Sequence, residues 1–114
     1  MSTDFLEQIE RIKRATLDGK ITWQKSGTNI YVWFIIDQHN RKVNAVLQKF
    51  NKGEKEIVLF RLWDPERKVA LLEQISDQVE PKYAEGILGL YNFVDELYRN
   101  PGLSYLDEVL DNIS

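Results

Sequence analysis

The 114-residue sequence contains no cysteine and a single histidine, and none of its apolar runs is long. The lack of cysteine excludes disulfides, thiol catalysis and thiolate-bound zinc, and it fits a reducing compartment. No apolar run approaches the roughly 20 residues that cross a bilayer, and the N-terminus lacks the apolar segment of a signal peptide. We therefore expect a cytoplasmic protein with no membrane partner.

Catalytic and phosphate-binding motifs are missing as well. There is no G-x-S-x-G nucleophile motif, and His39 stands in the polar run of residues 38–42, which is typical of a solvated turn rather than a general base. The glycines are isolated or lie in predicted helices, so they form no phosphate-binding loop. A metal would have to be held by carboxylates alone, and helix caps and solvated faces explain these carboxylates better. We expect no enzyme activity, no cofactor, no catalytic residue and no metal site.

What the sequence does contain is typical of an ordinary globular protein. It is 43% hydrophobic and 29% charged, and it has no linker, repeat or low-complexity segment. A chain of this length can bury roughly two thirds of its unfolded surface, which suffices for a core. We therefore predict one domain over residues 1–114, with residues 100–114 as a helical extension.

The net charge of −3 conceals an uneven distribution along the chain. Residues 1–72 carry 13 Lys+Arg and 9 Asp+Glu, a net +4, whereas residues 73–114 carry 2 and 9, a net −7. Such a division marks either an acidic surface for a basic partner or only the preference for lysine in turns and glutamate on helices. The sequence pI of about 5.2 disfavours nucleic acid as a partner. The candidate partner-binding residues are the acidic ones near the C-terminus: Asp95, Glu96, Asp107, Glu108 and Asp111.

Capping residues and apolar spacing predict a helix over residues 4–18. Asp4 followed by Glu7 has the form of a reciprocal N-terminal cap. Phe5 and Ile9 begin an apolar stripe at helical spacing, and Gly19 is typical of the residue that follows a helix.

Two more helices are predicted near the C-terminus. Residues 81–99 place apolar side chains around more than half of the helix circumference, so this helix needs more cover than a sheet alone supplies. The sequence Asn-Pro-Gly at residues 100–102 ends it. Ser104, with Asp107 three residues later, can cap a short final helix.

Short turns between β-branched and aromatic runs predict an antiparallel meander. The run IYVWFII at residues 30–36 is apolar throughout, so it should be a central strand with cover on both sheet faces. We expect a free strand edge after Val43 that can bind another protein. Residues 68–75 fit a strand or a helix, and we favour the strand. The predicted strands are therefore residues 20–24, 30–36, 43–50, 57–63 and, as a fifth, 68–75.

Gly86 and Gly89 lie one turn apart in the long C-terminal helix, where each costs roughly 1 kcal/mol relative to alanine. Such glycines usually permit a close backbone approach to a neighbouring element. That element is either the sheet or a partner helix across a dimer interface, and Phe93 extends the same side of the helix. Together with the broad apolar face, this pattern predicts a homodimer.

Aromatic residues on the predicted strands are candidates for stacking a flat ligand. Tyr31 and Trp33 share one strand face, and Trp63 lies on a later strand beside Arg61. If that face is open, Tyr31, Trp33 and Trp63 can stack a nucleotide-like molecule while Arg61 pairs with its charge. The alternative is that the rings belong to the core, with indole N–H groups bonded to loop carbonyls.

Residues 16–23, which read Thr-Leu-Asp-Gly-Lys-Ile-Thr-Trp, match the pattern T-x-x-G-x-I-x-W. The chain resembles small uncharacterised bacterial and phage proteins in which a helix precedes this pattern and an antiparallel meander follows it. Those proteins close with a helix that ends near a Leu-Tyr pair, here Leu97 and Tyr98. The resemblance implies a cytoplasmic α+β accessory domain of the kind found on mobile elements, and it carries no functional residues over.

We predict an α+β fold in which a four- or five-stranded antiparallel meander is flanked by an N-terminal helix and by one long and one short C-terminal helix. The function we expect is that of a non-enzymatic protein-interaction domain, homodimeric and of immunity, antitoxin, inhibitor or accessory type. A small acidic protein suits such a role because it can cover a basic site on another protein. The alternative is a module that binds a small flat ligand through strand tryptophan and tyrosine residues.

Overall fold

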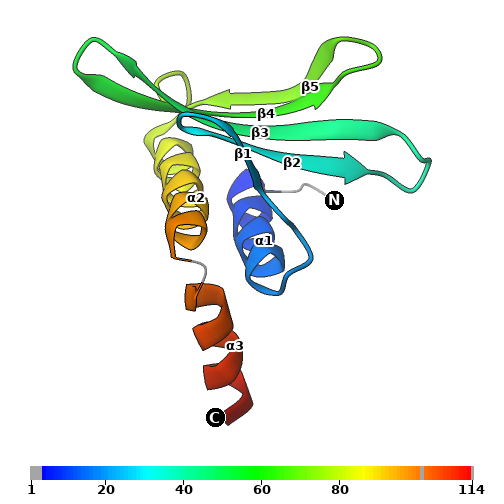
Figure 1. The fold of residues 1–114 in the computed structure, drawn as a ribbon. Helices are drawn as coiled ribbons and strands as arrows, with labels where there is room; N and C mark the ends of the chain where they lie inside the picture. The colour runs from blue at the N-terminus through cyan, green and yellow to red at the C-terminus, as the bar shows by residue number, and fades with distance from the viewer. Residues whose placement is uncertain (1–3, 101, 114) are drawn as a thin grey trace.

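The computed structural model describes residues 4–100 and 102–113, without the side chains of residues 103–105 and 107. It confirms the α+β fold, with a five-stranded antiparallel sheet, one helix before it and two helices after it. Both α1 and α2 lie on the same face of the sheet, below it in the view of Figure 1. The elements are α1 (Phe5–Leu17), β1 (Gln24–Gly27), β2 (Ile30–Ile36), β3 (Lys42–Lys52), β4 (Lys55–Asp64), β5 (Val69–Ile75), α2 (Pro81–Arg99) and α3 (Gly102–Ile113).

Helix α1 begins and ends as the capping residues predict. The Asp4 side chain accepts a hydrogen bond from the backbone N–H of Leu6 at 3.1 Å, which satisfies one of the free donors at the helix start. Gly19 follows the helix with a φ of 77°, in the left-handed region that glycine adopts without strain. On the side facing α2 and the sheet, Ile9 is buried.

The segment after α1 differs from the prediction, because residues 20–23 are not a strand. The backbone N–H groups of Lys20 and Ile21 both donate to the carbonyl of Ala15, which ties this segment to the end of α1. The indole N–H of Trp23 donates to the Thr16 hydroxyl at 3.1 Å. These bonds hold the chain against the helix, and β1 therefore begins only at residue 24.

The strands follow one another in the order β1-β2-β3-β4-β5, and each is antiparallel to its neighbours. Residues 69–75 form β5, which confirms the strand that we favoured over a helix. The free edge expected after Val43 is wrong, because β3 pairs with β2 on one side and with β4 on the other. The edges of the sheet belong to β1 and β5.

Helices cover only one face of strand β2. The prediction that both faces are covered is therefore wrong for the face opposite the helices. Tyr31 is fully buried on the helix side of the sheet, and Trp33 is half-buried there. Because side chains alternate along β2, Phe34 and Ile36 point to the opposite face. No helix of the described chain lies on that face (Figure 1). The continuous apolar run thus reflects one face covered by helices and one face without helix cover, on which Val32 is buried while Phe34 and Ile36 are exposed.

Helix α2 is covered by the sheet and by α1 together. A Cβ built at Gly86 would lie 2.7 Å from Leu6 Cδ2 and 3.1 Å from Ile9 Cδ1, so the close approach at this glycine is to α1. At Gly89 the nearest atom is Lys13 Nζ, at 3.6 Å. The neighbour is therefore neither the sheet nor a partner helix, which were the two alternatives considered. Phe93 is half-buried and packs against the core.

Helix α3 lies beyond the end of α2, on the side of the molecule away from the sheet (Figure 1). It begins at Gly102, two residues before the expected start, and the predicted capping side chains of Ser104 and Asp107 lie outside the described part of the chain. Within residues 4–100 and 102–113, no helix is both long and apolar enough to cross a membrane.

Candidate functional site

The face of the sheet opposite α1 and α2 carries a broad set of apolar side chains. Register fixes which residues share this face, because residues paired across strands point the same way. One row runs from Phe34 through Asn44 and Trp63 to Ala70 and so crosses four strands. We call this surface the open face.

Large exposed apolar side chains lie at both ends of the open face, and most of them gather at one end. Toward the turn between β3 and β4, Phe50 is 37% exposed, whereas Leu59 is buried. At the other end Phe34 is 58% exposed, Ile36 is 66% exposed and Leu71 is 43% exposed, while Trp63 is half-buried. Leu71 lies at the irregularity where the register between β4 and β5 shifts. We call the four residues Phe34, Ile36, Trp63 and Leu71 the distal patch.

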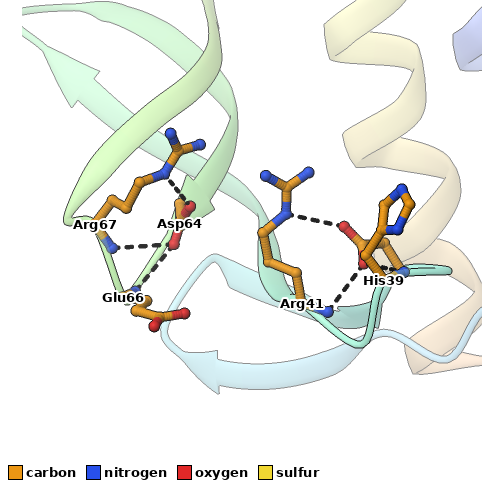
Figure 2. Close-up of polar contacts among 6 residues, drawn as sticks. His39, Arg41, Asp64, Glu66 and Arg67 are labelled. Carbon is orange, nitrogen blue, oxygen red and sulfur yellow. Dashed lines mark hydrogen bonds and ion pairs between the residues drawn. The ribbon is translucent and has the colours of Figure 1, made fainter.

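Two tight turns border the distal patch, one between β2 and β3 and one between β4 and β5, at the same end of the sheet (Figure 1). In the first, Asp37 accepts hydrogen bonds from the backbone N–H groups of His39 and Arg41 and from Arg41 Nε, each at 2.9 Å (Figure 2). These hydrogen bonds hold the pKa of Asp37 below its ordinary value, and the bond from the Arg41 backbone N–H has the largest effect. His39 is exposed, and this turn uses its backbone N–H.

The second turn is organised by Asp64, a buried carboxylate at the end of β4. It accepts hydrogen bonds from the backbone N–H groups of Glu66 and Arg67 and from Arg67 Nε, the last at 2.9 Å (Figure 2). The side-chain bond from Arg67 is the main reason that the pKa of Asp64 is lowered. Lys68 completes the turn with a φ of 57°, a conformation uncommon for a residue with a side chain. Asp64 is therefore a turn residue, and its own carbonyl accepts a hydrogen bond from the backbone N–H of Lys68 at 2.8 Å.

Two exposed lysines, Lys42 and Lys68, stand beside one exposed carboxylate, Glu66, at this end, so the rim of the distal patch carries a small positive charge. Lys42 is exposed and pairs in register with Ile36, and exposed Lys68 lies in the turn after β4. Arg41 and Arg67 are also present, but each is paired with the carboxylate of its own turn. Within the described part of the chain, Lys42 and Lys68 have no ion-pair partner.

The acidic residues predicted to bind a partner do not form one surface. Asp95, on α2, accepts a hydrogen bond from the Tyr31 hydroxyl at 2.6 Å and pairs with Arg99 at 3.1 Å, so it is engaged inside the fold. Glu96 is exposed on α2. Glu108 and Asp111 are exposed on α3, and the side chain of Asp107 lies outside the described part of the chain.

The predicted ligand-stacking residues are likewise divided between the two faces of the sheet. Tyr31 is buried under Tyr91 and Tyr98, with ring centroids 5.7 Å and 5.6 Å away. Burial, and then the hydrogen bond to Asp95, raise the pKa of the Tyr31 phenol above its ordinary value. Of the other predicted ligand-stacking residues, Trp33 lies on the helix side of the sheet, whereas Trp63 and Arg61 lie on the open face. Arg61 is paired there with Glu73 at 2.7 Å.

Trp33 nevertheless borders a groove that sequence reasoning did not predict. The groove lies between α1 and the segment that follows it, and its volume is about 460 Å³. Trp33 lies beside Trp23, with ring centroids 5.9 Å apart. The charged side chains that line the groove are Arg11, Arg14, Lys20 and Asp18. Spacing could not reveal this site, because Trp33 and the cations are brought together only when α1 packs on the sheet.

The distal patch did leave a signal in the sequence, namely the apolar alternation of Phe34 and Ile36, but the sequence does not say which face is covered.

Among residues 4–100 and 102–113, no three His, Cys, Asp or Glu side chains gather as metal ligands would. No family model, no curated protein and no solved structure matches the chain.

Proposed function

We propose that the chain is a non-enzymatic protein-interaction domain that forms a homodimer and uses the distal patch as its contact surface. The observation that carries this proposal is the exposure of Phe34 and Ile36 beside each other on a face that no described helix covers. Large apolar side chains grouped on an exposed surface are typical of protein-binding sites. An inhibitor, immunity or accessory role suits a small chain of net charge −3.

Burial of the distal patch would supply a substantial part of a binding free energy. Removing apolar surface from water contributes about 25 cal/mol per Å², and the cores of interfaces are formed by a few large apolar or aromatic side chains. The patch offers such side chains on rigid strands, since β2, β3 and β4 are paired along its whole width. Little conformational entropy would therefore be lost on the sheet side when a partner binds.

Native mass spectrometry of the purified chain tests the proposal by reporting its oligomeric state. Sedimentation measures the dissociation constant of the dimer. We expect a dimer in the unmodified protein and a loss of about tenfold or more in affinity in the double variant Phe34→Thr, Ile36→Thr. Threonine keeps the strand propensity of these positions while it removes most of their apolar surface. The matched control is Gln24→Thr, at an exposed strand position outside the patch.

A chain that stays monomeric at its highest soluble concentration would contradict the proposal. A dimer with the same dissociation constant in the double variant and in the Gln24→Thr control would contradict it too. Unfolding curves of each variant show whether any loss of affinity reflects a loss of fold instead.

A second candidate function rests on the groove beside Trp33. Arg11 and Lys20 line the same groove as the Trp33 indole, and Arg14 there lies 3.8 Å from Asp18, a set that suits a flat, negatively charged molecule. The same mass spectra test this candidate. A retained molecule of a few hundred daltons that disappears in the variant Trp33→Leu would favour the ligand-binding function over the interaction function.

A further inference from the structure

Helix α3 presents an apolar stripe that the rest of the described chain leaves uncovered. Leu106 and Leu110 are each 51% exposed, and Ile113 is 74% exposed. These positions, with half-buried Val109, recur at intervals of three and four residues, so they lie along one side of the helix. A helix with such a stripe is stable in water only when something packs against it.

The stripe on α3 and the distal patch agree in size. From Leu106 to Ile113 the helix rises about 10 Å, at 1.5 Å per residue. The row from Phe34 to Ala70 crosses four strands and is therefore about 14 Å wide. A helix laid across the strands at this row would set its apolar side chains among those of the patch, in the way that amphipathic helices fill apolar grooves.

The two surfaces also have opposite charge. Residues 102–114 contain three acidic residues and no lysine or arginine, whereas at the rim of the distal patch Lys42 and Lys68 outnumber the single further carboxylate, Glu66. A dimer that packed one distal patch directly on another would bring the lysines of both copies together at its rim, which is unfavourable. An acidic helix on the patch brings opposite charges together instead.

We propose that the two copies of the homodimer exchange their α3 helices, so that α3 of each copy packs on the distal patch of the other. In the structure α3 lies on the helix side of the molecule, and the sheet separates it from its own distal patch (Figure 1). The exchange covers both uncovered apolar surfaces of both copies with two equivalent contacts, as two-fold symmetry requires. This inference rests on the proposed function, since it identifies what occupies the patch.

Two sets of substitutions test the exchange by mixing. The patch variant is Phe34→Thr, Ile36→Thr, and the helix variant is Leu110→Gln, Ile113→Gln, which retains helix propensity. Each variant alone has both contacts damaged, so each should dimerise at least about tenfold more weakly than the unmodified chain. A one-to-one mixture should form a heterodimer, because the intact α3 of the patch variant can pack on the intact patch of the helix variant. Size-resolved native mass spectrometry separates the heterodimer by its mass.

The mixing result separates the possible occupants of the patch. A heterodimer that exceeds both homodimers establishes contact between two copies. A dimer that needs the patch but is unchanged in the helix variant would overturn the exchange and leave the proposed function standing. A chain that remains monomeric in every form would overturn both. If α3 instead packed on the patch of its own copy, both variants would lose folding stability and mixing would produce no heterodimer, which would also overturn the exchange.

Discussion

At the scale of single residues, the most informative contact joins Tyr31 in the sheet to Asp95 in α2. The two lie 64 positions apart in sequence, and the phenol hydroxyl donates to the carboxylate at 2.6 Å. Arg99 pairs with the other oxygen of the same carboxylate at 3.1 Å. The ring of Tyr31 also packs against the rings of Tyr91 and Tyr98. The acidic residue expected to bind a partner thus helps to fix α2 on the sheet.

We expect the substitution Tyr31→Phe to lower the free energy of unfolding by about 1–2 kcal/mol, since it removes a hydrogen bond to a charged acceptor and retains the ring. Urea unfolding at neutral pH measures this change. The control is Tyr98→Phe. The ring of Tyr98 packs against the same Tyr31, but the Tyr98 side chain is exposed. Equal effects of the two substitutions would show that the bond to Asp95 contributes nothing specific.

At the scale of elements, the packing of α1 on α2 depends on the absence of a side chain at one position. Gly86 leaves no room for a Cβ unless Leu6 and Ile9 shift, whereas Gly89 faces only the end of the Lys13 side chain. Both glycines cost helix stability, but only the first permits a close approach. The two positions therefore separate the cost of glycine in a helix from its use in packing.

We expect Gly89→Ala to raise the free energy of unfolding by about 0.5–1 kcal/mol, through the gain in helix propensity. Gly86→Ala gains the same propensity but forces Leu6 and buried Ile9 to move, so it should be less stable than Gly89→Ala by about 1 kcal/mol or more. Thermal or urea unfolding of the two variants provides the comparison. A Gly86→Ala variant as stable as Gly89→Ala would mean that α1 adjusts freely and that the contact is loose.

At the scale of the whole molecule, charge and apolar surface are distributed together. The first 72 residues have a net charge of +4 and include the distal patch, whereas residues 73–114 have a net charge of −7 and end in the amphipathic α3. The proposed dimer brings these two surfaces together between copies. The sheet carries the first of these surfaces, and α3, beyond the end of α2, carries the second.

We expect the dimer to weaken severalfold as sodium chloride is raised from low concentration toward 1 M, because screening shortens the reach of exposed charges from about 10 Å at 0.1 M to about 3 Å at 1 M. In the variant Lys42→Gln, Lys68→Gln, the dimer should be weaker at low salt and its dissociation constant should depend less on salt. Sedimentation at a series of salt concentrations measures both slopes. A dissociation constant that is unaffected by salt would contradict the charge pairing between α3 and the rim of the patch.

The sequence by itself determined the order of the elements and the type of most of them, but it left residues 68–75 open between a strand and a helix. Capping residues located α1, helical spacing located α2, and the turn residues between β-branched runs located the strands, because each of these signals acts over only a few residues. Asp64 shows the same locality, since its side chain bonds to the two residues after Pro65. Where a distant contact decides a local structure, the prediction failed. Residues 20–23 were expected to be a strand, and the bonds of Trp23 and Lys20 to α1 hold them out of the sheet.

Only the tertiary structure decided which apolar surfaces are buried. In β2 both sets of alternating residues are apolar, so periodicity cannot distinguish the covered face from the open one. That choice depends on where α1 and α2 pack, and it buries Tyr31 while it leaves Phe34 exposed. The candidate sites follow the same logic, because the groove at Trp33 and the distal patch each join residues from separate elements. Burial is a property of the assembled molecule, and a single sequence records only the residues from which it is made.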